Sequence, residues 1–284
     1  MKRSFLRKKK FWFRFLGIVF ALPILLLTIA LSILYFKQHD LIQAEIEALN
    51  KGYKGKIEIG RTHLKPFANF PYISIKIDDV GILESKDSKA EKLLSVKDIY
   101  TGFNVWDIIQ GNFDIKNLLI EDGALNLIFH KDGTLNIQNA LQTNKEAAGE
   151  NPMDIHLKNI QLRNIDIHKL DEATNVDVET FIYYAKGGFQ TAGDLINAHI
   201  DTEFELNIVD NGDSTYIKRK HFEFHTDLSL NDKTGKLIFQ PSGIRMEHGD
   251  FDIEGSIDLK NDVSLDLKIK GSKPNFDMLI AFAP

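Results

Sequence analysis

The chain has 284 residues, no cysteine and a formal net charge of −5. The absence of cysteine excludes disulfides, thiolate catalysis and cysteine-ligated zinc. The first 36 residues carry +7, whereas the remaining 248 carry 28 Lys and Arg against 40 Asp and Glu, a net of −12. Because this acidic main part lacks the basic patch that binds nucleic acid, we expect no nucleic-acid partner.

The N-terminal region is typical of a membrane anchor. A basic tail at residues 1–14 precedes an uncharged run at residues 15–36. As a helix rising about 1.5 Å per residue, this run is about 33 Å long, enough for a hydrocarbon core of about 30 Å. The positive-inside rule predicts a single-pass protein with a cytoplasmic N-terminus and export of everything after Lys37. The side chains that we assign to this anchor are Phe15, Leu16, Ile18, Phe20, Leu22, Leu25, Leu27, Leu31, Leu34 and Phe36.

A cleaved signal peptide is the alternative interpretation of this region. Its apolar core is usually about 7–15 residues long and ends at a small-x-small site. The run here is longer and ends in the bulky residues 33–36, with Ala30-Leu31-Ser32 as the one weak cleavage candidate. We therefore favour an uncleaved signal anchor.

Residues 37–55 are predicted to form a linker that contains a short amphipathic helix. Leu41, Ile42, Ile46 and Leu49 recur at helical spacing, and Asn50 to Gly52 is a typical helix end. We expect this helix at the membrane exit, either docked on the following domain or lying at the membrane interface.

From Lys56 onward the dominant pattern has a period of two, as in Ile73, Ile75 and Ile77. Alternation of apolar and polar residues predicts half-buried strands, and antiparallel sheets can leave one face in water. The predicted fold class is all-β: a long curved antiparallel sheet, open as a groove, with an N-terminal transmembrane helix and short amphipathic helices. A loop at residues 143–152 divides two β segments, at residues 56–142 and 153–284. The second ends in an apolar stretch at Pro284, typical of an element that packs against a later part of a longer chain or against a partner.

Turn residues and short helical patterns complete the element prediction. Asp132-Gly133 predicts a hairpin, and Asp122-Gly123, Asn211-Gly212 and Gly249 predict further breaks. Helical periodicity is visible at residues 105–110, 137–142 and 276–282.

Catalytic and metal-binding patterns are missing from the sequence, so we expect neither an enzyme nor a cofactor. There is no nucleophile elbow, P-loop, dinucleotide fingerprint or His-Glu-x-x-His. His221, Glu223 and His225 would share one face of a strand, but about 3.3 Å per residue puts the outer pair about 13 Å apart, too far to share one ion. Asp78 and Asp79 are adjacent in a strand and are predicted to point to opposite faces, which disfavours an acid/base pair.

A long sheet with one apolar face needs something to cover that face. A second sheet would give an ordinary sandwich. Alternatively, the sheet curls into a trough whose apolar lining is covered by acyl chains. Periodicity alone does not distinguish these two arrangements.

Several motifs occur together in residues 55–136. They are Phe70-Pro71 before the strand of Ile73, Asp79-Val80, Leu94-x-Val96-x-x-Ile99, Trp106-Asp107-Ile108-Ile109-x-Gly111, Ile115-x-x-Leu118 and Asp132-Gly133-Thr134-Leu135-Asn136. With the preceding membrane anchor and short helix, this order resembles the N-terminal region of the AsmA-like envelope proteins, a group that includes TamB. Residues 155–171 and 249–284 are similar to the middle β repeats of that family.

The resemblance implies a β-groove in the periplasm, anchored in the inner membrane, that carries or shields phospholipid for outer-membrane biogenesis. Expected partners are the membrane, phospholipid acyl chains and envelope proteins. The candidate lipid-facing residues are Ile73, Ile75, Ile77, Leu125, Leu127, Phe129, Val263, Leu265 and Leu267. The alternative function is a non-enzymatic β scaffold or regulator of outer-membrane protein assembly, which binds protein partners through an exposed strand edge.

Overall fold

The computed structural model describes residues 2–87, 92–141, 158–210, 214–231, 233–258 and 264–271. The elements in chain order are α1 (Lys2–Gly52), β1 (Lys56–Glu58), β2 (Thr62–Asn69), β3 (Tyr72–Leu83), β4 (Lys92–Phe103), α2 (Val105–Ile109), β5 (Ile115–Phe129), α3 (Asn136–Leu141), β6 (Asn159–Asp171), β7 (Val176–Ala192), β8 (Leu195–Asp210), β9 (Ser214–Asn231), β10 (Lys236–Met246), β11 (Gly249–Asp258) and β12 (Ser264–Gly271). Helices α2 and α3 confirm two of the predicted helical segments, whereas residues 276–282 lie outside the described residues.

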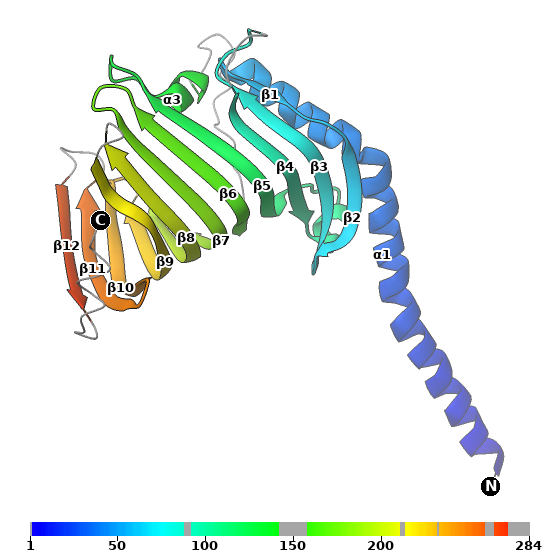
Figure 1. The fold of residues 1–284 in the computed structure, drawn as a ribbon. Coiled ribbons are helices and arrows are strands. Elements are labelled where there is room, and N and C mark those ends of the chain that lie inside the picture. The colour runs from blue at the N-terminus through cyan, green and yellow to red at the C-terminus, as the bar shows by residue number, and fades with distance from the viewer. Residues whose placement is uncertain are drawn as a thin grey trace.

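All twelve strands of the described residues belong to one sheet, in the order β1-β3-β4-β5-β6-β7-β8-β9-β10-β11-β12, with β2 also paired to β3. The two ends of this path do not pair with each other, so the sheet is open, and its strands turn progressively from one end to the other (Figure 1). The predicted long, open, mainly β fold with an apolar N-terminal helix is thus confirmed. Within the described ranges, no second sheet forms the other half of a sandwich.

One strand pair departs from the antiparallel prediction. Strands β5 and β6 are parallel, while every other pair in the sheet is antiparallel. A parallel neighbour requires a long connection back to the same end of the sheet, and here that connection contains α3 and the predicted loop at residues 143–152, which lies outside the described residues. Hydrogen bonds between β5 and β6 join the two predicted β segments into one continuous sheet.

The N-terminal helix corrects the prediction of two separate helices. Helix α1 is continuous from Lys2 to Gly52 and includes Pro23, so the segment 40–50 is its last part. No Gly or Pro occurs between residues 24 and 51, and nothing in the sequence therefore interrupts the helix after the apolar run. Over Ala21–Gly52, α1 is long and apolar enough to cross a membrane.

The second half of α1 packs on the apolar face of the sheet at its β1–β4 end (Figure 1). The buried side chains of Ala30, Leu34 and Ile42 belong to the main core cluster, together with Ile73 and Ile75 of β3. Asn50 then joins the helix end to β1, because its side-chain oxygen accepts from Ile57 N at 2.6 Å and its amide donates to Ile57 O at 2.9 Å. The protein itself therefore closes this end of the sheet.

Left-handed residues keep the apolar face continuous where the strands bend. Asp79, Asp122 and Asn164 have φ near +50° to +56° inside β3, β5 and β6. In β3, Ile77 and Val80 on either side of Asp79 both belong to the core cluster, so apolar side chains three residues apart remain on the same face. Asp and Asn tolerate this conformation better than other non-glycine residues. The predicted break at Asp122-Gly123 is therefore a left-handed residue inside the continuous strand β5, not a turn.

The other predicted turns have mixed outcomes. Asp132 accepts from Thr134 N at 2.9 Å and Gly133 has φ 81°, so this turn is present, although the chain continues into α3 instead of a paired strand. Gly249 follows the turn between β10 and β11. Asn211-Gly212 lies outside the described residues.

Candidate functional site

The apolar face of the sheet is assembled from residues directly opposite each other in neighbouring strands. One row crosses six strands, because the register pairs Gly123, Ile165, Ile182, Phe204, Phe222 and Met246 in succession. Directly opposite residues project to the same face. The row on one side of it contains Ile120, Leu162, Ala185, Thr202, Phe224 and Ile244, and the row on the other contains Leu125, Ile167, Thr180 and Leu206.

This apolar face is covered by helices at one end only. Helices α1 and α2 pack at the β1–β4 end, and α3 packs on β5. As far as the structure describes the chain, strands β6–β12 make their main contacts with their neighbours in the sheet. Phe204 and Phe222 are accordingly half-buried, with their rings stacked at 5.1 Å. The face over β6–β12 is therefore an apolar surface without a described cover.

Three hydroxyl groups on the apolar face have hydrogen-bond partners within the sheet. Thr202 Oγ1 donates to Tyr184 O at 3.0 Å, and Ser242 Oγ donates to Thr226 Oγ1 at 2.7 Å. A polar group without a partner would disfavour an apolar ligand by a few kcal/mol, and these bonds remove that cost. The face can thus contact hydrocarbon at Thr202 and Thr226 in spite of their hydroxyls.

The nine predicted lipid-facing residues fall into three groups. Ile73, Ile75 and Ile77 are buried under α1, so their side chains are core and we remove them from the predicted lining. Leu125, Leu127, Phe129 and Leu267 are half-buried, and the first two lie on the apolar face by register. Nothing is described of the Leu265 side chain, and Val263 lies outside the described residues.

The prediction missed the centre of the face. Ile182, Phe204 and Phe222 lie in the middle row, and Met246 and Phe251 form a second buried cluster with Phe222 and Ile244 packed against it. The same period-two alternation marks these strands in the sequence, so it could have found them. What it could not supply was the register that brings residues 165, 182, 204 and 222 together.

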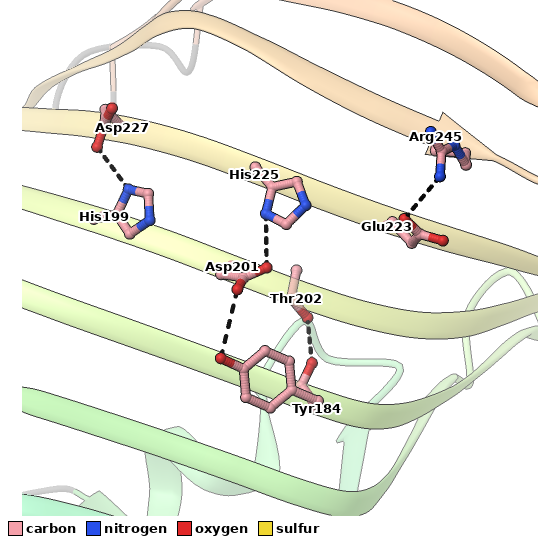
Figure 2. Close-up of polar contacts among 8 residues, drawn as sticks. All are labelled: Tyr184, His199, Asp201, Thr202, Glu223, His225, Asp227 and Arg245. Carbon is pink, nitrogen blue, oxygen red and sulfur yellow. Dashed lines mark hydrogen bonds and ion pairs between the residues drawn. The ribbon is translucent and has the colours of Figure 1, made fainter.

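The opposite face of the sheet is polar and its side chains pair across strands (Figure 2). His225 Nδ1 lies 2.7 Å from Asp201 Oδ1, and His199 Nδ1 lies 2.8 Å from Asp227 Oδ1. Burial, helped by the nearby Asp201 carboxylate, raises the pKa of the Tyr184 phenol. These pairs are largely exposed, so they favour solubility far more than stability.

Charges continue along this polar face toward the C-terminal end of the sheet. Arg245 Nε donates to Asp250 at 2.9 Å and its Nη1 lies 3.3 Å from Glu223. The hydrogen bond to Asp250 raises the pKa of the Arg245 guanidinium. At the other end, Lys76 contacts Asp78 at 2.9 Å and Asp98 at 2.7 Å, and these hydrogen bonds raise the pKa of Lys76 and lower that of Asp78.

The structure shows ordinary ion pairs at the two sites that the sequence analysis considered for metal binding and acid/base chemistry. His221 contacts Glu203 at 3.3 Å and Glu223 contacts Arg245, so the His221, Glu223 and His225 side chains do not converge on one point. Within the described ranges, no group of His, Asp and Glu has a geometry that could hold a metal ion. Asp78 is engaged by Lys76 and His63, and the adjacent Asp79 is exposed.

The predicted anchor residues divide along α1. Leu22, Leu25 and Phe36 are exposed, as a lipid-facing position requires, and Leu27 and Leu31 are partly buried. Leu34, also assigned to the anchor, is fully buried in the core cluster, so its side chain packs on the protein. Nothing is described of the side chains of Phe15, Leu16, Ile18 and Phe20.

A comparison with the models of known protein families gives no match, and no curated protein sequence matches the chain.

Proposed function

We propose that this protein is anchored in the inner membrane by α1 and that it holds or shields phospholipid acyl chains on the apolar face of its sheet in the periplasm, as an AsmA-like protein of outer-membrane biogenesis. The observation that supports this most is the unequal cover of one continuous face. Helix α1 closes the face over β2–β4, while the same rows of apolar side chains continue without a described cover over β6–β12.

Acyl chains suit this surface energetically. Each CH₂ removed from water contributes about 0.8 kcal/mol, so a chain that lies along Ile182, Phe204 and Phe222 gains several kcal/mol. The face is many strands wide, and the hydroxyls of Thr202, Thr226 and Ser242 already have partners. Transfer of a lipid along such a face avoids exposing its tails to water.

A charged side chain marks one border of the apolar face. Lys169 lies opposite Leu127, and its ammonium is 5.1 Å from the centre of the Phe129 ring. An ammonium at the border of an apolar surface suits a phosphate headgroup whose tails lie on that surface. The polar face on the other side of the sheet remains in water.

The competing function is a scaffold that binds a protein through a strand edge. Its motivating observation is β12, which ends the described sheet and presents Ile269 with 62% of its surface exposed. An edge strand of this kind can accept a strand from a partner. Such a scaffold would not require bound lipid.

The proposal is tested on the full chain, because removing the first 36 residues would also remove Ala30 and Leu34 from the core. We would purify the protein from membranes, exchange the detergent for an amphipathic polymer and identify bound lipid by mass spectrometry. We expect stoichiometric phospholipid, and less of it in Phe204→Asp, which places a charge in the middle row.

Tyr183→Asp is the matched control, because Tyr183 is an exposed aromatic on the polar side of β7. Circular dichroism must show that both variants fold. Equal lipid in Phe204→Asp and Tyr183→Asp would contradict the proposal, and a lipid-free wild type that recovers a defined protein partner would favour the scaffold.

A further inference from the structure

Exposed aromatic side chains gather where α1 leaves the sheet. Phe67 and Phe70 in the β2–β3 hairpin are 71% and 80% exposed, and Trp106 at the start of α2 is 59% exposed. Single exposed apolar residues need no explanation, but a group at one end of a domain marks an interaction surface. Neither the core nor the apolar face of the sheet uses these three side chains.

The strand register places these residues at the same end of the sheet. The hairpin turn pairs Asn69 with Tyr72, and Ile73 lies opposite Phe103, only two residues before α2 begins. Leu34 of α1 belongs to the same buried cluster as Phe103 of β4 and Ile108 of α2. Figure 1 shows α1 passing this end beside β2 and continuing away from the sheet toward the N-terminus.

The charge pattern of α1 indicates how deep the α2 end of the sheet would lie relative to a bilayer. The uncharged run ends at residue 36, and the ammonium of Lys37 lies 5.6 Å from the centre of the Phe113 ring, in the loop that follows α2. Ala30, which packs in the cluster around Ile108, is seven residues nearer the N-terminus, or about 10 Å along the helix axis. Each headgroup layer is only about 5–8 Å thick. A bilayer spanned by α1 therefore brings the α2 end of the domain into its headgroup layer.

The composition of the hairpin fits that layer. Residues 66–75 carry no charge, and the exposed Lys65 precedes them. Aromatic rings concentrate at the membrane interface, and lysine ammonium groups reach the headgroups from its border. On α1 itself, Tyr35 and Phe36 are exposed at the corresponding height, next to Lys37.

We infer that Phe67, Phe70 and Trp106 form a second contact with the bilayer, in the headgroup layer beside α1. Two contacts restrict the tilt of the sheet relative to the bilayer, because a single helix would leave the domain free to tilt with it. The strand ends at α2 then rest on the membrane. This inference rests on the proposed anchoring by α1, but it does not require lipid on the apolar face.

The test uses the two tryptophans of the chain, Trp12 and Trp106. The Trp12→Phe protein, reconstituted in vesicles of phosphatidylethanolamine and phosphatidylglycerol, reports Trp106 alone. Lipids that carry a nitroxide near the headgroup should remove most of the Trp106 fluorescence, and lipids that carry it at the end of the acyl chain should remove less. Phe67→Ser with Phe70→Ser should reduce the shallow quenching.

Three further single-tryptophan proteins separate the outcomes. The Trp106→Phe protein retains Trp12, which reports insertion of α1. The other two proteins lack both native tryptophans. One carries Tyr183→Trp as the water-facing control, and the other carries Phe204→Trp as a reporter of the apolar face. Quenching of Trp106 no stronger than that of the Tyr183→Trp reporter overturns the inference, as does an unquenched Trp12. If Trp12 and the Phe204→Trp reporter are quenched and Trp106 is not, the proposal of lipid on the apolar face is retained and the headgroup contact is refuted.

Discussion

Two regions of one sheet have the same alternating sequence pattern, but a helix covers the apolar face of only one of them. Over β2–β4, the apolar face is buried by α1 of the same chain, and Ile75 has no exposed surface. Over β6–β12, equivalent rows of side chains have no described cover, and Phe204 and Phe222 are only half-buried. Alternation therefore indicates that a face is apolar, whereas the packing of other elements decides whether that face is core or binding surface.

We expect the greatest loss of stability in Ile75→Asp, which we compare with Leu127→Asp. Ile75 is enclosed by the α1 cluster, so its carboxylate would be buried without a partner, and we expect loss of folding or a cost above about 4 kcal/mol. Leu127 lies at the border of the open face, and its variant should fold with a cost of about 1 kcal/mol. Urea denaturation followed by circular dichroism measures both. Equal stability would show that the cover by α1 does not form.

The contact of α1 with the sheet is tested by Leu34→Ala, with Leu25→Ala as the control on the exposed side of the same helix. Leu34 is fully buried, so truncation should cost about 2–5 kcal/mol. Leu25 is 56% exposed, and its truncation should leave the unfolding free energy of the domain nearly unchanged. A stable Leu34→Ala protein would mean that α1 does not complete the core.

A pH-dependent effect is expected at the polar side of the covered end. Lys76 lies between Asp78 and Asp98, and Lys76→Met should cost roughly 1–3 kcal/mol at pH 7, because it removes the ammonium from both carboxylates and leaves Asp78 with His63 as its remaining partner. The lowered pKa of Asp78 contributes stability above the unfolded value of about 3.9, and this is lost as the pH falls through the folded pKa. The difference between wild type and variant should therefore shrink at pH 3. A constant difference from pH 7 to pH 3 would exclude this linkage.

We expect the least effect from changing the left-handed residue of β6, which lies in the middle of the sheet between the apolar side chains of Leu162 and Ile165. Asn164 has φ 52°, a conformation that disfavours β-branched residues by about 1–2 kcal/mol. Asn164→Val should lower the thermal midpoint, while Asn164→Gly should be close to wild type. If both variants have the same midpoint, the left-handed residue contributes nothing to the fold.

The sequence predicted the fold class because period-two alternation and the uncharged helix are local signals. It did not predict the continuity of α1 through residues 37–52, since the helical spacing of Leu41, Ile42 and Ile46 fits a separate helix equally well. The parallel β5–β6 pair depends on a long connection that no local motif encodes. Ile75 was assigned to a lipid surface because the sequence shows the same alternation of apolar and polar residues whether a helix or an acyl chain covers the strand.

We propose that acyl chains contact the open apolar face in the cell. A photo-crosslinking amino acid at Phe204, in the full chain expressed in its native membrane, tests this directly, with the same probe at Tyr183 on the polar face and at Ile75 under α1. We expect a phospholipid adduct at position 204, identified by mass spectrometry, and none at the other two positions. A folded protein that gives no lipid adduct at position 204, or gives equal adducts at positions 204 and 183, would contradict it.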